Sequence, residues 1–182
     1  MEDIVKVIEV LKEAEFKRML SLVYAMWTPL GAFTAYLMLL TNSLTPLWLL
    51  VIGIIPYAAL VRKMRRIKYL EDKRTLKYSV ILAIVLETLL GLLSPPLGAA
   101  GAVAGWLSGI AIALGKEGIL DALAGWGTLV LTAIAYIMDL NTFEQWVLFV
   151  LAVTTCYSAA AIARALEGLY EVLPYVGESR ER

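Results

Sequence analysis

The sequence predicts an all-α integral membrane protein with six transmembrane helices, both termini in the cytoplasm and an amphipathic helix before the first span. Three observations support this fold class. Of the 182 residues, 60% are hydrophobic and only 18% are charged, a composition shifted away from that of soluble domains. Six apolar segments are each long enough to cross about 30 Å of hydrocarbon as a helix. The Lys and Arg residues gather in alternate loops.

Residues 1–18 are rich in charge and predict an amphipathic helix. Its apolar residues recur at helical period and form one stripe: Ile4, Val7, Ile8, Leu11 and Ala14. Acidic residues outnumber basic ones in this segment, so charge alone gives little attraction to anionic lipid. We therefore expect the stripe to lie at the bilayer interface or to pack on a protein partner.

The six predicted spans form one domain, residues 19–166, followed by a cytoplasmic tail at 167–182. The spans are 19–41, 44–62, 78–94, 97–115, 119–138 and 146–166. Short turns with helix-breaking residues join most of them. Pro29 and Pro56 fall inside the first two spans, where they could interrupt the helices as in transporters. Proline is also common in membrane helices that have no such role.

The distribution of basic residues predicts the orientation. The loop 62–77 carries eight Lys and Arg residues, whereas the turns at 42–43, 95–96 and 139–145 carry none. By the positive-inside rule, the termini and loop 62–77 lie in the cytoplasm, and the protein lies in the cell membrane, in contact with the lipid bilayer. The loop could also dock a protein partner or acidic headgroups, but topology alone explains its charge. We favour the topological interpretation.

Glu87 is the most informative polar residue, because it falls near the predicted midplane of the third span. Small residues share its helical face and bulky apolar residues cover the opposite face, so we expect Glu87 to point into the bundle. Hydroxyl groups at a similar depth in other spans could meet it there: Tyr57, Thr128, Thr154, Thr155 and Tyr157. Together they are candidates for a coupling site or for the lining of a solute path. The alternative is a neutral acid hydrogen-bonded to a neighbouring helix.

Two further features predict contacts between helices. Asp121 and Arg164 fall at a similar depth near the cytoplasmic ends of the last two spans, so we expect them to form a structural ion pair. Gly101, Gly105 and Gly109 form a double GxxxG pattern in the fourth span, which allows another backbone to approach closely. We favour an internal mate, and a homo-oligomer through this face is the alternative.

Composition argues against several classes of function. The chain has no His and one Cys, so we expect no metal site or other cofactor and no Ser-His-Asp catalysis. The formal net charge of zero argues against a nucleic-acid partner. Asp121 and Asp139 belong to opposite membrane faces, so they cannot form the acidic cluster of a metal-dependent lipid transferase. We expect no enzyme, and the scarcity of side-chain amides is typical of a thermophilic source.

Two functions remain. The first is a non-catalytic subunit or scaffold of a membrane complex, with a partner at the N-terminal helix or at loop 62–77. The second is the membrane component of a small-solute or ion transporter, with Glu87 as its polar site. In size and span count the chain is similar to permease subunits driven by a separate ATPase and to the substrate-binding subunits of energy-coupling vitamin transporters. This likeness is one of architecture and involves no shared motif, so we favour the first function.

Overall fold

The computed structural model describes residues 2–67 and 73–178, and the regular elements within these ranges are all helices. The first, α1 (Glu2–Thr41), joins the predicted amphipathic helix and the first predicted span into one helix of 40 residues. Lys17 and Arg18, at the expected boundary, favour helix, and no breaker stands beside them. The helix also continues through Pro29. There is accordingly no break at residue 18 and no interruption at Pro29.

The second predicted span, 44–62, is divided into three short helices. They are η1 (Thr45–Leu47), α2 (Trp48–Ile52) and α3 (Ile54–Ile67). The break falls at Gly53, whose N–H donates to the carbonyl of Leu50 three residues back. Pro56 follows close behind and has no N–H to donate to the preceding turn. The interruption that Pro56 predicts is therefore present, shifted slightly toward the N-terminus.

Each of the remaining predicted spans overlaps one helix. These helices are α4 (Lys73–Gly91), α5 (Pro95–Leu114), α6 (Ile119–Ile137) and α7 (Thr142–Glu178), with η2 (Gly115–Gly118) between α5 and α6. The ends of α3 and α4 extend into the predicted loop 62–77, whose residues 68–72 lie outside the described ones. Likewise, α7 continues into the predicted tail.

Within the described residues, four helices are long and apolar enough to cross a membrane. The qualifying stretches are Val7–Thr41 of α1, Pro95–Ile112 of α5, all of α6 and Thr142–Tyr170 of α7. The segment Thr45–Leu60, by contrast, is a shorter apolar stretch. Several long apolar helices are compatible with a membrane location, whereas the count of six spans stays a prediction.

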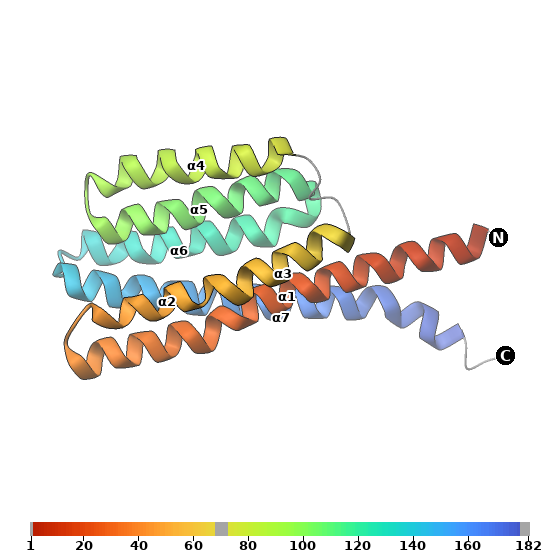
Figure 1. Cartoon of the computed structure of the whole chain (residues 1–182), viewed down its shortest axis with the longest axis horizontal. Coiled ribbons are helices and arrows are strands. Elements are labelled where there is room, and N and C mark those ends of the chain that lie inside the picture. The colour runs from red at the N-terminus through yellow and green to blue at the C-terminus, as the bar shows by residue number, and fades with distance from the viewer. Residues whose placement is uncertain (1, 68–72, 179–182) are drawn as a thin grey trace.

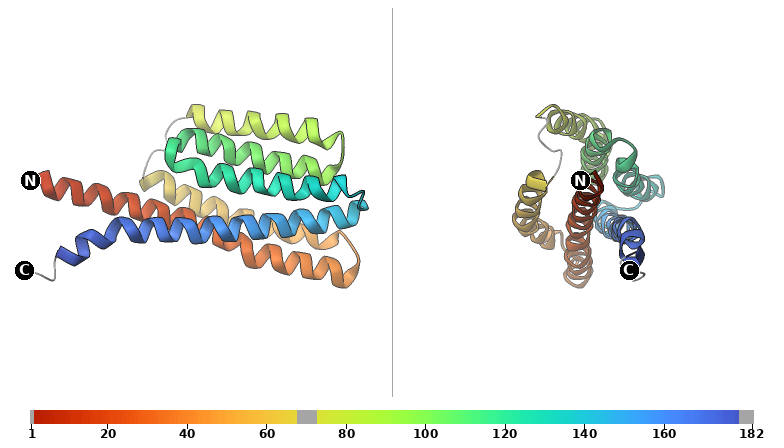
Figure 2. Two further views of the ribbon diagram at one scale, coloured as in Figure 1. Left: turned by 180° about the vertical axis from the view of Figure 1, so that it is seen from behind. Right: turned by 90° about the vertical axis from the view of Figure 1, so that its right-hand side faces the viewer.

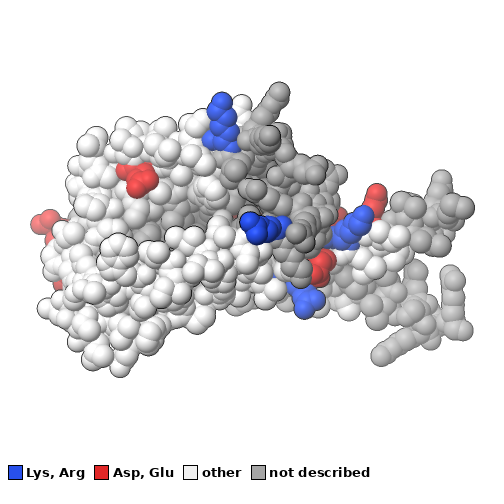
Figure 3. Space-filling view, viewed as in Figure 1, with Lys and Arg blue, Asp and Glu red and all other residues white. Residues whose placement is uncertain are grey.

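The helices pack side by side as an open arc, in the order α3, α1, α7, α6, α5 and α4 (Figure 2). Among the described residues, α3 packs on α1, α4 packs on α5, and the two outer helices do not contact each other. The N-terminal part of α1 and the C-terminal part of α7 project together beyond the other helices (Figure 1). Lys and Arg side chains gather toward this same end of the molecule (Figure 3).

The glycine pattern of α5 packs against α4. A Cβ added at Gly105 would lie 2.5 Å from the carbonyl oxygen of Leu82, and one added at Gly109 would lie 2.3 Å from the Cα of Ser79. Gly101 approaches α4 in the same way. The mate of this face is thus internal, as the sequence analysis favours, and α4 already covers the surface that a second copy would need.

Replacing Gly105 with Leu should destabilise the protein severely, because the new side chain would collide with the backbone of α4. Ordinary overpacking costs about 1–3 kcal/mol, and a collision with backbone should exceed that. Thermal unfolding in detergent, followed by circular dichroism, measures the effect. Ala159→Leu is the matched control, since Ala159 is exposed on α7. A Gly105→Leu variant as stable as this control would contradict the close packing of α4 on α5.

Candidate functional site

α1 and α7 run antiparallel and form the most extensive helix pair of the bundle. Small hydroxyl side chains connect them at two levels. Ser21 Oγ donates to the carbonyl of Ala161 over 2.8 Å, and Thr28 Oγ1 lies 3.0 Å from Ser158 Oγ. Residue numbers rise along α1 as they fall along α7, so these contacts fix a single antiparallel register. The pair therefore forms the frame on which the polar site is built.

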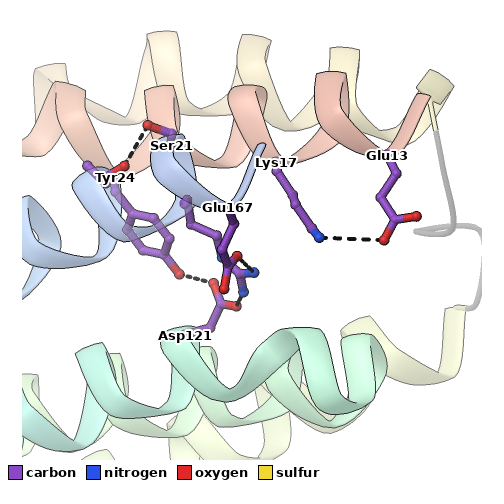
Figure 4. Close-up of polar contacts among 8 residues, drawn as sticks. Glu13, Lys17, Ser21, Tyr24, Asp121 and Glu167 are labelled. Carbon is purple, nitrogen blue, oxygen red and sulfur yellow. Dashed lines mark hydrogen bonds and ion pairs between the residues drawn. The ribbon is translucent and has the colours of Figure 1, made fainter. Parts of the chain in front are cut away.

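One face of α1 carries a row of polar side chains directed toward α6 and α7 (Figure 4). Glu13, Lys17, Ser21 and Tyr24 are spaced four, four and three residues apart, which places them on the same face of a helix. Lys17 is only 7% exposed, and its ammonium nitrogen lies 3.5 Å from Glu13 Oε1. Between Glu13 and Tyr24, the face of α1 that is turned toward the bundle is consequently polar.

The row ends at a buried charge network (Figure 4). Asp121 of α6 is completely buried; it accepts a hydrogen bond from the Tyr24 hydroxyl at Oδ1 and one from Arg164 Nη2 of α7 at Oδ2. Arg164 is 1% exposed, and its Nη1 also donates to Glu167 Oε2 over 2.9 Å. The structure thus contains the Asp121–Arg164 ion pair that the sequence predicts, joined by Tyr24 and Glu167.

Energetics indicate what this network does. Removing a carboxylate and a guanidinium from water is costly, and the cost is offset only when their remaining bonding positions are filled. Both oxygens of Asp121 are bonded, and Arg164 bridges two carboxylates. These bonds satisfy the main bonding positions of both charged groups. The consequence is mechanical, because the network holds α1, α6 and α7 together at one level of the bundle.

Aromatic side chains fill the next layer of the core. The rings of Tyr24 and Tyr157 meet edge to face with centroids 5.1 Å apart, and those of Trp27 and Tyr57 lie 6.2 Å apart. Trp106 Nε1 donates to the hydroxyl of Tyr57 over 3.2 Å. Side chains of α1, α3, α5 and α7 therefore converge on one cluster, in which stacking and burial supply most of the stabilisation.

Of the predicted midplane group, Tyr57 and Tyr157 come together in this cluster. Thr128 is completely buried in α6, where its hydroxyl donates to the carbonyl of Ala124 over 2.9 Å. Thr155 is exposed on α7 and bonds its own helix in the same manner. Thr154 faces α1, because a Cβ at Gly31 would lie 2.3 Å from its hydroxyl oxygen. These hydroxyls do not line one shared space.

Glu87 lies on the exposed side of α4, so the prediction that it points into the bundle is wrong. The glycines of α5 determine which side of α4 faces inward, and they meet Ser79, Leu82 and Leu86. Glu87 follows Leu86 and is rotated from it by about 100° around the helix, which moves it away from α5. The small residues Ala83 and Gly91 do face α5, where they meet Gly105 and Gly98, but the side chain of Glu87 is exposed beside them.

Sequence analysis did not identify Tyr24 or Lys17 as part of the polar site. The signal was present, because four polar residues of α1 recur at spacings of four, four and three where the charged segment gives way to the apolar one. Tyr24 also falls at nearly the same predicted depth as Asp121. The prediction for this helix used its apolar stripe and did not consider the polar row on a different face.

A comparison of the chain with protein families, with curated proteins and with solved structures found no match.

Removing the carboxylate of Asp121 should cost about 3–5 kcal/mol of stability, because it leaves a buried guanidinium without its main partner. Thermal unfolding of Asp121→Ala in detergent measures this loss. Asp139→Asn is the control, as Asp139 is an exposed acid. Replacing both Asp121 and Arg164 with Leu should destabilise less than Asp121→Ala. If Asp121→Ala were as stable as the control, the network would not hold the helices together.

Proposed function

We propose that the chain is a non-catalytic subunit or scaffold of a membrane complex, with six membrane passes and both termini in the cytoplasm. One observation carries this proposal: α1 and α7 extend together beyond the rest of the bundle and expose apolar side chains there (Figure 1). A protein that used its helices only to remain in the bilayer would not need such an extension.

The lengths of the helices support a position of this extension outside the hydrocarbon. Residues 19–41 of α1 span about 34 Å, which is already enough to cross a bilayer core of about 30 Å. Along α7, residue 167 lies about 38 Å from Thr142. The segments before residue 18 and after residue 167 therefore project into the cytoplasm in the proposed orientation. We call them the stalk.

The stalk exposes apolar side chains on both of its helices. They are Val7, Ile8 and Leu11 of α1 and Leu169, Tyr170 and Leu173 of α7. Leu11 is 52% exposed and Tyr170 is 70% exposed. Exposed apolar surface outside a membrane marks an interaction site, and these side chains are suited to an apolar face on a partner protein. The apolar stripe of the predicted amphipathic helix is part of it.

The distribution of charge supports the proposed topology. The helix ends on the side of both termini (Figure 1) carry the exposed bases Lys12 and Arg18 of α1, Arg62 of α3 and Lys77 of α4. The exposed acid Asp139 follows α6, at the opposite end. This asymmetry is the one that the positive-inside rule associates with cytoplasmic termini. The outer faces of α3 and α4 expose mostly apolar side chains, which suits these two helices as the remaining passes.

Transport is the second proposal and has less support. It rests on Glu87, a carboxyl group within an apolar helix, which is a common feature of solute and proton pathways. However, Glu87 and Thr155 are exposed while Thr128 is enclosed within the bundle. A shared path would require a rearrangement that brings these three side chains to one space.

Native mass spectrometry of the protein, extracted from its own membranes in mild detergent, tests the subunit proposal. We expect the chain to leave the membrane in a complex of fixed stoichiometry with a second protein. The paired substitution Leu11→Gln and Leu173→Gln should dissociate that complex, because it places polar groups on the apolar surface of the stalk.

The matched control introduces the same residue at exposed polar positions of the stalk, Glu9→Gln and Lys12→Gln, and should leave the complex intact. A wild-type chain that appears as a lone monomer or homo-oligomer would contradict the proposal. A complex that dissociates equally in both variants would show that the apolar surface is not the contact.

A further inference from the structure

The exposed face of α4 presents a carboxyl group within apolar surface. Glu87 is exposed, and its neighbours on the same face of the helix, Val80 and Ile84, are exposed apolar residues. Glu87 is the one acidic residue in the sequence of α4. Within the described part of the chain, no side chain bonds to its carboxylate.

This carboxylate lies inside the apolar band and not at its edge. Glu87 is about 15 Å along the helix from Lys77 and about 10 Å from the turn at Ser94. A charged group at such a depth is costly when it faces lipid, so acidic residues in membrane spans nearly always face protein or a polar cavity. The described residues provide no such cover, because the arc is open between α3 and α4. The cover must come from another molecule.

Charge complementarity specifies what that molecule carries. A carboxylate in a membrane is best matched by a basic side chain at the same depth. A second copy of this chain would bring a like charge to the site. Within the bundle core, Arg164 is 1% exposed and already bonded to Asp121, so a copy has no equivalent base to offer there.

We propose that the Glu87 face of α4 docks a transmembrane helix of a partner protein, and that this helix carries a Lys or Arg at the depth of Glu87. The inference rests on the proposed role as a complex subunit but uses a surface separate from the stalk. It adds the chemistry of the partner: an apolar helix with a single central base.

The test uses a synthetic transmembrane peptide as its probe, a Leu/Ala-rich helix with one central Lys, and a matched peptide with Leu in that position. The full chain is reconstituted in phosphatidylcholine vesicles, with a donor dye on Asn42→Cys in a Cys156→Ser background. Energy transfer to an acceptor on the peptide reports association. We expect the Lys peptide to bind about tenfold more tightly than the Leu peptide, a preference typical of interhelical polar contacts.

Three variants make the result specific to this face. Glu87→Gln should abolish the preference, while Asp139→Asn, which removes an exposed acid outside the apolar band, should preserve it. Exchanging Glu87 and Leu89 keeps the composition but turns the carboxylate by about 200° around α4, so the preference should also fall. Circular dichroism confirms that each variant is folded before binding is compared.

Equal binding of the two peptides to the wild-type chain would overturn the proposal, as would a preference that survives Glu87→Gln. A preference that survives the exchange would show that charge alone matters and not the docking face. Energy transfer between two copies of the chain that Glu87→Gln abolishes would assign the face to self-association. Failure here leaves the stalk result unaffected, because the stalk variants change other helices.

Discussion

Asp121 places a carboxylate at a level of the bundle where water does not reach, and each of its oxygens must therefore find a donor within the protein. Tyr24 of α1 and Arg164 of α7 provide them. Three helices that are far apart in the sequence are thus held at one level, because shifting any of them along its axis would leave a buried charge without a partner. The cost of such a loss exceeds that of most single contacts in a folded protein.

The register of α1 against α7 follows from this constraint and extends in both directions. On one side of the network, Thr28 contacts Ser158, and Tyr24 packs against Tyr157 in the aromatic cluster. On the other side, Gly168 lets α7 approach α1 beside Lys17, where the stalk begins. The outer helices are attached differently, α4 through the glycine face of α5 and α3 through its contacts with α1. The stalk and the Glu87 face lie away from this firmly bonded centre and are exposed.

The sequence predicted those features that depend on the length of a helix and on the depth of its residues. Apolar length located the helices. Matching depth paired Asp121 with Arg164, because a base and an acid at one level of a membrane protein have few other partners. The orientation of Glu87 could not be obtained in this way. The inward face of α4 is selected by the backbone of α5, and a rotation of about 100° decides whether the acid is covered.

The continuity of α1 and the role of Tyr24 were missed for a related reason. A change from charged to apolar composition near residue 18 suggested a boundary, but helix formation depends on breakers and not on polarity. The polar row on α1 can be identified as part of a site only once α7 is known to pack beside it, because α7 provides Ala161 and Arg164. The periodicity of a sequence shows which residues share a face of one helix, but it does not show which distant helix packs against that face.

Disulfide trapping in native membranes tests the antiparallel pairing of α1 and α7 most directly. In a Cys156→Ser background, Thr28→Cys with Ser158→Cys should form an intramolecular disulfide under mild oxidation, because the two hydroxyl oxygens lie 3.0 Å apart. Thr28→Cys with Ala159→Cys should remain reduced, since Ala159 is exposed and is rotated by about 100° from Ser158 around α7. A disulfide in the second pair and not in the first would contradict the register on which the rest of the bundle depends.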